Sequence, residues 1–100
     1  MQGAHARMNS PLNGYEGHVR MHIEVHSKEG CPWCEKAKEW LFERGHPYVE
    51  VRHDDPAERA AFYDKQGLEG GARTMPQVFI VEDGESMRVG GYDKLDTSGL

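Results

Sequence analysis

The sequence predicts an α/β domain in the order βαβ-α-ββ-α, with a four-stranded mixed sheet flanked by helices. Apolar residues alternate in residues 21–26, follow helical spacing in 35–44, and alternate again in 48–52. Later, Asp55-Pro56 marks the start of a second helix, and Asp83-Gly84 marks the turn of a hairpin. The first two strands, joined by a helix, should be parallel with a right-handed crossover, and the hairpin adds an antiparallel pair.

The first half of this domain is predicted as strand, helix and strand. In residues 21–26, Met21, Ile23 and Val25 would share one side of the strand. The helix carries an apolar stripe that starts at Cys34 and is completed by Ala37, Trp40, Leu41 and the alkyl stem of Arg44. Gly45 supplies the left-handed residue that commonly ends a helix.

The second half is predicted as helix, hairpin and a final short helix. Asp55 is suited to the N-cap, Pro56 to the first helical position, and Glu58 follows three residues after the cap. The helix should reach about Gln66 and close at Gly67. A glycine-rich connector over 67–72 leads to strands at 77–81 and 86–89, and residues 92–100 leave room for one short helix.

Composition limits the possible functions. A chain of 100 residues with 37% hydrophobic residues suits one domain, and its net charge of -5 disfavours a nucleic-acid partner. No apolar run is long enough to cross a membrane. Residues 1–20 show no sustained period, so we expect a flexible N-terminal extension or tag before a domain at 21–100. Two cysteines without a secretory signal suit a reducing cytoplasm.

The two cysteines, Cys31 and Cys34, stand where the first strand gives way to the helix. With Pro32 at the first helical position, free N–H groups and the positive end of the helix point toward Cys31 and favour its thiolate. Lys28 adds positive charge nearby, whereas Glu29 and Glu35 oppose it. We therefore predict a lowered pKa for Cys31, the nucleophile, and a resolving role for Cys34, one turn further in.

Two other readings of the cysteine pair remain open. The pair is half of a zinc site if histidines supply the other ligands, but His22 and His26 fall in a strand, where their spacing does not converge on one ion. His46 and His53 are expected to be surface loop residues. Alternatively, the cysteines are inert core residues. We expect no metal.

Three motifs together resemble the glutaredoxins, a family of the thioredoxin fold. They are Lys-Glu-Gly-Cys-Pro-Trp-Cys at 28–34, Thr-Met-Pro-Gln-Val-Phe at 74–79 and Gly-Gly-Tyr-Asp-Lys-Leu at 90–95. The resemblance covers about residues 21–95 and is strongest to small dithiol glutaredoxins of bacterial and phage type. It implies a thioredoxin-like fold, glutathione as reductant and, in some members, electron supply to ribonucleotide reductase.

The resemblance also implies roles for individual residues. Pro76 matches a cis-proline that presents the Met75 main chain to an extended ligand. Asp93 matches the acceptor of the γ-glutamyl ammonium of glutathione, and Lys28 matches a partner of its carboxylate. The implied binding set is Lys28, Trp33, Arg73, Thr74, Met75, Pro76, Gly90, Gly91, Tyr92 and Asp93, with Cys31 and Cys34 as the catalytic pair.

Some positions depart from the family pattern. Trp33 replaces the commoner tyrosine, and Arg59 is only a weak match for the second-helix residue that often helps to bind glutathione. Arg73 could equally be a solvated loop charge.

From the three motifs and the resemblance we expect a monomeric, cytoplasmic glutathione-disulfide oxidoreductase acting on protein disulfides and glutathione mixed disulfides. The alternatives are a redoxin served by thioredoxin reductase and a module that binds zinc or an iron–sulfur cluster.

Overall fold

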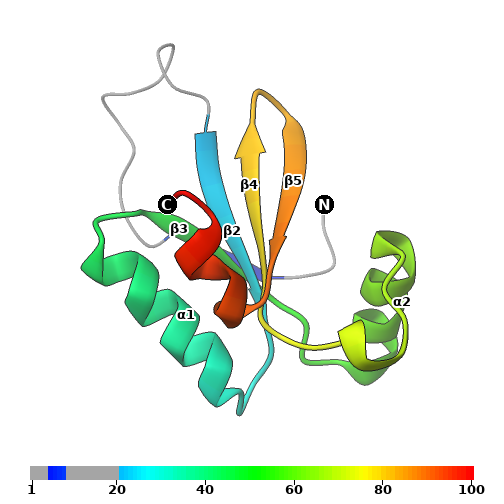
Figure 1. The fold of residues 1–100 in the computed structure, drawn as a ribbon. Helices are drawn as coiled ribbons and strands as arrows, with labels where there is room; N and C mark the ends of the chain where they lie inside the picture. The colour runs from blue at the N-terminus through cyan, green and yellow to red at the C-terminus, as the bar shows by residue number, and fades with distance from the viewer. Residues whose placement is uncertain (1–4, 9–20) are drawn as a thin grey trace.

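The computed structural model describes residues 5–8 and 21–100 and places five strands in one sheet of order β1-β3-β2-β4-β5 (Figure 1). Strands β2 (Met21–Ser27) and β3 (Tyr48–Arg52) are parallel and are joined by helix α1 (Pro32–Glu43). Helix α2 (Pro56–Gln66) and the short 3-10 helix η1 (Gly70–Ala72) precede the antiparallel hairpin of β4 (Gln77–Glu82) and β5 (Glu85–Gly90). A second 3-10 helix, η2 (Tyr92–Thr97), follows. The predicted mixed sheet of four strands corresponds to β2, β3, β4 and β5, and the predicted order of elements is confirmed.

One strand was not expected. Strand β1 (His5–Met8) pairs antiparallel with β3 at the edge of the sheet. This strand belongs to the segment, residues 1–20, that was expected to be a flexible extension. The other residues of that segment, 1–4 and 9–20, lie outside the described part of the chain. The domain boundary at residue 21 stays a prediction.

The helix ends follow the predicted capping chemistry. The Asp55 side chain accepts a hydrogen bond from the Glu58 N–H at 2.9 Å, and Gly67 ends α2 at a φ of 72°. In the hairpin turn, Asp83 and Gly84 both have positive φ, which matches the twist of the two strands. The Glu58 carboxylate does not complete a capping box, because it lies against His53 instead.

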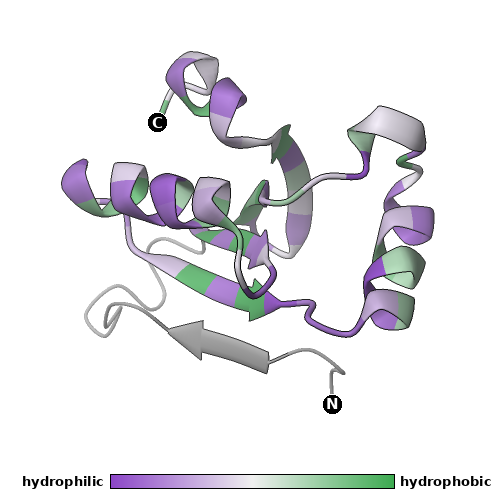
Figure 2. Ribbon diagram, turned by 90° about the horizontal axis from the view of Figure 1, so that it is seen from below, coloured by the Kyte–Doolittle hydropathy of each residue, from purple (hydrophilic) through white to green (hydrophobic). Residues whose placement is uncertain are grey.

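Two apolar clusters form the interior of the described residues. Hydrophobic and hydrophilic residues alternate along the strands (Figure 2). The larger cluster joins the sheet to α1 and η2 through Ile23, Val25, Ala37, Leu41, Tyr48, Val78 and Leu95. The smaller one joins the cysteines to α2 and the following loop through Cys31, Cys34, Tyr63, Leu68 and Met75. The cysteines are therefore held by packing from α2 as well as by their own helix.

The expectation that His53 is a surface loop residue is wrong. Its side chain is buried, with 3% of the residue exposed, and its ring centroid lies 4.4 Å from that of Phe62. The main-chain N–H of His53 donates to the Ser27 carbonyl at 2.8 Å, which draws it under α2. The apolar ring of Phe62 covers it from the helix, so a position with loop sequence becomes part of the interior. His46 is partly buried.

Candidate active site

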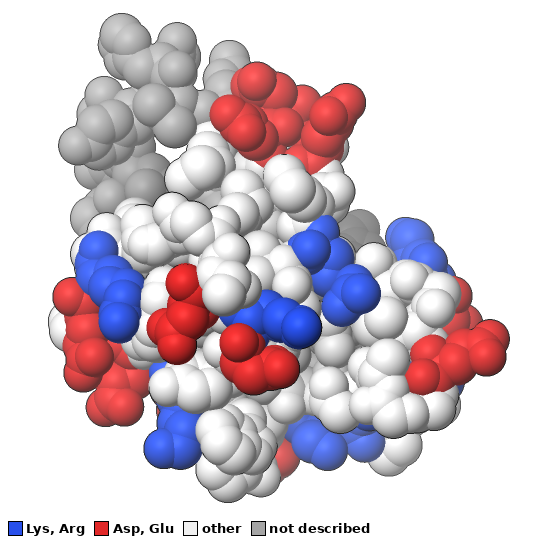
Figure 3. Space-filling view, in the orientation of Figure 1, with Lys and Arg blue, Asp and Glu red and all other residues white. Residues whose placement is uncertain are grey.

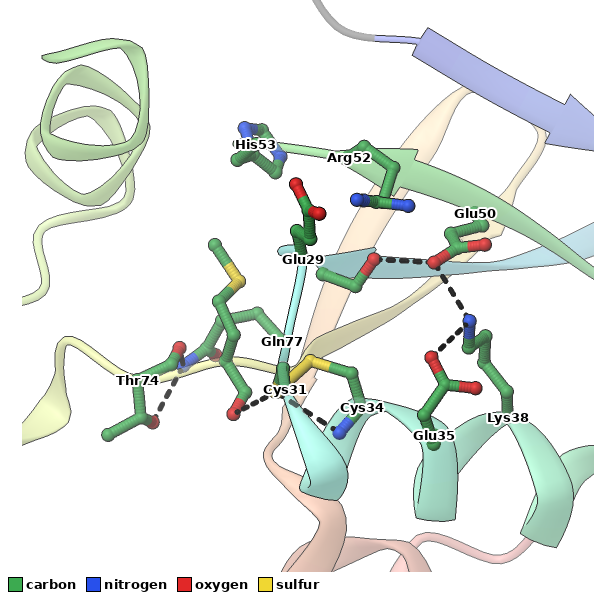
Figure 4. The surroundings of a disulfide bond; sticks show 12 residues. Glu29, Cys31, Cys34, Glu35, Lys38, Glu50, Arg52, His53, Thr74 and Gln77 are labelled. Atoms are coloured by element: carbon green, nitrogen blue, oxygen red, sulfur yellow. Dashed lines mark hydrogen bonds and ion pairs between the residues drawn. A yellow bond between two sulfur atoms is a disulfide. The ribbon is translucent and has the colours of Figure 1, made fainter. Parts of the chain in front are cut away.

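Cys31 and Cys34 form a disulfide at the N-terminus of α1 (Figure 4). Cys31 is the N-cap residue, and Pro32 occupies the first turn, where a missing N–H costs no helical hydrogen bond. The Cα atoms of the two cysteines lie 5.3 Å apart. Cys31 keeps 8% of its surface exposed and Cys34 only 1%. An external disulfide can therefore reach Cys31 more readily than Cys34.

Polar main-chain groups surround the Cys31 sulfur. The Cys34 N–H donates to the Cys31 Sγ at 3.2 Å, and the Met75 carbonyl oxygen lies 3.5 Å from the same sulfur. After reduction, the Cys34 N–H and the helix N-terminus would both stabilise a thiolate at this position. The lowered pKa of the Cys31 thiol stays a prediction, because the structure holds the disulfide.

An open cleft of about 270 Å³ lies beside the disulfide. Met75, which lines it, precedes a cis peptide bond to Pro76. Trp33 and Tyr92 lie at its aromatic side, with ring centroids 5.6 Å apart. The cleft is lined by seven residues of the predicted set, Trp33, Thr74, Met75, Pro76, Gly91, Tyr92 and Asp93. Residues from three separate stretches of sequence thus meet at one surface.

Three residues of the predicted set do not line this cleft, namely Lys28, Arg73 and Gly90. The Arg73 side chain turns toward α2, where it pairs with Asp64 and donates to the Leu68 carbonyl at 2.7 Å. Arg59, the weak match in α2, donates to the His53 carbonyl at 2.8 Å. Gly91 does line the cleft, and a Cβ atom there would lie only 3.2 Å from the Asp93 Oδ1. A side chain at Gly91 would therefore crowd the carboxylate.

A buried polar chain that the sequence analysis missed lies beside the cysteines (Figure 4). Glu50 accepts hydrogen bonds from the Ser27 hydroxyl at 2.7 Å and from Lys38 Nζ at 3.0 Å, and Lys38 also pairs with Glu35 at 2.9 Å. Burial raises the pKa of Glu50, but the bonds from Ser27 and Lys38 outweigh it and hold the pKa below its ordinary value. The sequence does carry one signal for this polar chain. Glu50 follows Tyr48 by two residues in the same strand, so its side chain lies on the same face of the sheet as that buried tyrosine.

A second polar chain joins the sheet to α2. His26 Nδ1 and His53 Nε2 lie 2.7 Å apart, His26 Nε2 lies 3.0 Å from Glu24, and His53 Nδ1 lies 2.9 Å from Glu58. Burial is the largest influence on His53 and lowers its pKa. Within the described part of the chain, no three His, Cys, Asp or Glu side chains are grouped to hold one metal ion.

The disulfide lies far from the acidic region of the molecular surface. Acidic side chains gather at the tip of the β4–β5 hairpin, where Glu82, Asp83 and Glu85 lie together (Figure 3). The N-terminus of α1, with the disulfide, lies at the opposite end of the molecule (Figure 1). None of the helices in the described residues is both long and apolar enough to cross a bilayer.

The fold and the site define a class of protein, the thiol–disulfide oxidoreductases of the thioredoxin fold. The glutaredoxin family model matches residues 23–86, and the chain belongs to the glutaredoxin family. It is 39% identical to glutaredoxin 1 of Rickettsia conorii over 75 residues, covering 73% of this chain and 67% of the relative. Cys31 and Cys34 are its redox-active pair.

Two solved structures are similar to this one. Glutaredoxin 1 from Francisella tularensis, complexed with cacodylate, is 34% identical with a TM-score of 0.62, covering 77% of this chain and 90% of that one. A buckwheat glutaredoxin–glutathione complex is 26% identical with a TM-score of 0.58, covering 77% and 66%.

Proposed function

We propose that this protein is a dithiol glutaredoxin that uses glutathione to reduce glutathione mixed disulfides and protein disulfides. One observation carries the proposal: Asp93 and Met75 line the same cleft, and the Met75 carbonyl oxygen lies 3.5 Å from the Cys31 sulfur. Asp93 offers an acceptor for an ammonium group. Met75 offers a peptide edge, because no group of the described residues accepts from its N–H. The glutathione bound to the buckwheat relative supports this choice of ligand.

Glutathione has two carboxylates, one ammonium and two amide bonds, so its site needs cations, an acid and a main-chain edge. Asp93 would bind the ammonium, and Met75 would pair with the ligand as an added strand. Lys28 is the better candidate for a carboxylate, since it forms no ion pair within the described residues, whereas Arg73 is already paired with Asp64. Trp33 and Tyr92 would cover the ligand from the side.

The proposed reaction on a glutathionylated protein has two steps. The Cys31 thiolate attacks the glutathione sulfur, the mixed disulfide breaks, and the protein thiolate leaves and takes a proton from water. A second glutathione thiolate then attacks the glutathione sulfur bound to Cys31. That attack releases glutathione disulfide and restores the Cys31 thiolate.

On a protein disulfide, Cys34 completes the reaction. Attack by Cys31 leaves one substrate sulfur bound to Cys31 and releases the other as a thiolate. The Cys34 thiolate then attacks the Cys31 sulfur, which frees the second substrate thiolate and forms the Cys31–Cys34 disulfide seen here. Two glutathione molecules reduce this disulfide and become glutathione disulfide. Under this proposal the protein is a cytoplasmic monomer, and ribonucleotide reductase is one candidate substrate.

A comparison of electron donors tests the proposal. Wild-type protein is supplied with a disulfide substrate and either glutathione with glutathione reductase or thioredoxin reductase alone, and NADPH consumption is followed. We expect turnover with glutathione and only background consumption with thioredoxin reductase. Turnover with thioredoxin reductase alone would refute glutathione dependence while leaving the dithiol chemistry intact.

A further inference from the structure

The two walls of the cleft are the ends of neighbouring strands. One wall, residues 74–76, leads directly into β4, whose first residue is Gln77. The other wall, residues 91–93, follows β5, in which Arg88 lies two residues before the last, Gly90. The walls approach closely, because a Cβ atom on Gly91 would lie 3.7 Å from the Pro76 carbonyl oxygen. Whatever fixes these two strand ends therefore fixes the width of the cleft.

Gln77 is bound to the first wall. Gln77 is only 2% exposed. Its Nε2 donates to the Thr74 carbonyl at 2.9 Å (Figure 4) and to the Ala72 carbonyl at 3.4 Å. The Thr74 hydroxyl lies 3.5 Å away. A buried amide with this many partners holds the loop in one conformation, because any other position would leave buried polar groups unpaired.

Arg88 connects Gln77 to the second wall. Its Nη1 donates to the Gln77 Oε1 at 3.2 Å, and the same Nη1 would lie 3.9 Å from a Cβ atom on Gly90. The register of the hairpin shifts here, since Val78 pairs with Gly90 whereas Phe79 pairs with Arg88. Val89 is thus an extra residue that bends the end of β5. The pairing with Phe79 puts Arg88 on the sheet face of Gln77, within diagonal reach.

We propose that the hydrogen bond between Gln77 and Arg88 is a brace beneath the cleft, which sets the spacing of its two walls for the glutathionyl group. Both side chains are positioning residues: they act through Thr74–Pro76 and Gly91–Asp93 and do not touch the sulfur. The inference rests on the proposed function, since it deepens how that site recognises its substrate. A displacement of either wall would change the distance between Asp93 and the Met75 main chain, and both must reach the same ligand.

The test uses variants that remove the brace from each end. Arg88→Met removes the donor and keeps the length of the side chain, and Gln77→Met removes both the acceptor and the donors to 72–74. Lys65→Met, at the exposed end of α2, is the control for loss of one positive charge. Arg88→Lys keeps a hydrogen-bond donor, so its KM should lie between those of the wild type and Arg88→Met. If Gln77→Met does not fold, Arg88→Met still tests the brace, because Arg88 is exposed and its replacement does not disturb the interior.

We expect Arg88→Met to raise the KM for a glutathionylated peptide about 3- to 10-fold, while kcat changes less than about 2-fold. Alkylation of reduced Cys31 by iodoacetamide should keep its wild-type rate, because this small reagent does not use the walls. The double variant should be no worse than Gln77→Met alone, since one bond is lost in both. A KM equal to that of Lys65→Met, or equal losses in kcat and in alkylation, would overturn the brace.

An amide NMR spectrum provides a readout that does not depend on activity. The Thr74 N–H donates to Ala72 in the first wall segment, and the Lys94 N–H donates to Gly91 in the second, each at 3.0 Å. Arg88→Met should shift the Thr74 resonance, and Gln77→Met should shift that of Lys94, more than Lys65→Met shifts either. Unmoved resonances would overturn the brace even in an active enzyme. A wild type without glutathione-dependent turnover would instead refute the proposed function, and the cross-wall shifts would still decide the brace.

Discussion

At the scale of single residues, the two cysteines have different surroundings although they are only three positions apart in the sequence. The Cys31 sulfur accepts a hydrogen bond from the Cys34 N–H and Cys31 keeps 8% of its surface exposed, whereas Cys34 is packed in the interior with 1% exposed. Cys34→Ser should therefore keep activity toward glutathionylated peptides and lose activity toward protein disulfides. Cys31→Ser should lose both. Turnover assays with the two substrates check this, and the opposite pattern would show that Cys34 is the nucleophile.

Asp93 is the acidic residue of the cleft lining, so its charge should matter for binding more than for chemistry. Asp93→Asn should raise the KM for a glutathionylated peptide about 10-fold, because a charge-assisted hydrogen bond is worth about 1.5–3 kcal/mol. Asp83→Asn makes the same charge change at the distant hairpin tip and should leave KM within about 2-fold. Steady-state kinetics compare the two, and equal effects would mean that Asp93 acts only through net charge.

The sequence predicted much of this site because its motifs fix local geometry. Pro32 and the N-cap position of Cys31 followed from helix chemistry, and the cis bond before Pro76 followed from the family resemblance. Arg73 is different. Its pairing with Asp64 depends on where α2 ends relative to the following loop, and no local pattern encodes that distance.

At the scale of elements, α2 is fastened to the sheet through His53 and Glu58. His53→Ala would open space beneath Phe62 and remove the partners of both His26 and Glu58. We expect a loss of about 2–3 kcal/mol in the free energy of unfolding. His46→Ala, which removes a partly buried histidine whose Nε2 lies 3.2 Å from the Leu100 carbonyl, should cost less than about 1 kcal/mol. Urea denaturation measures both, and equal losses would argue against the fastening of α2.

Elements with strong end signals were predictable. Asp55, Gly67 and the Asp83-Gly84 turn each dictate a backbone conformation that fixes a boundary. Strand β1 carries no such signal, because a four-residue edge strand is held by main-chain pairing that many sequences can provide. The burial of His53 could not be predicted from local sequence for a related reason, since it depends on contact with Phe62 of another element.

At the scale of the whole molecule, three groups couple stability to pH in the same direction. The hydrogen bond with His26 lowers the pKa of Glu24, and the bonds from Ser27 and Lys38 lower that of Glu50 in spite of burial. Both ordinary values are 4.5, and burial lowers the pKa of His53 from 6.5. Because the unfolded chain binds these protons more readily, acid favours unfolding.

The expected profile follows from these directions. The contribution of His53 should decline as the pH falls below 6.5, and those of the two glutamates should decline below 4.5, as the pH passes through their lower folded values. Glu50→Gln should flatten the decline between about pH 5 and pH 3 relative to wild type. Urea unfolding across this range measures the slope, and a variant with an unchanged slope would exclude Glu50 as a source.

The central claim is that the cleft recognises the glutathione half of a mixed disulfide and delivers its sulfur to Cys31. Its most direct test is to react the Cys34→Ser variant with a glutathionylated peptide and to identify by mass spectrometry the group that becomes bound to the protein. We expect glutathione to be attached to Cys31, with the peptide released as a free thiol. The peptide attached to Cys31, with glutathione released, would contradict it.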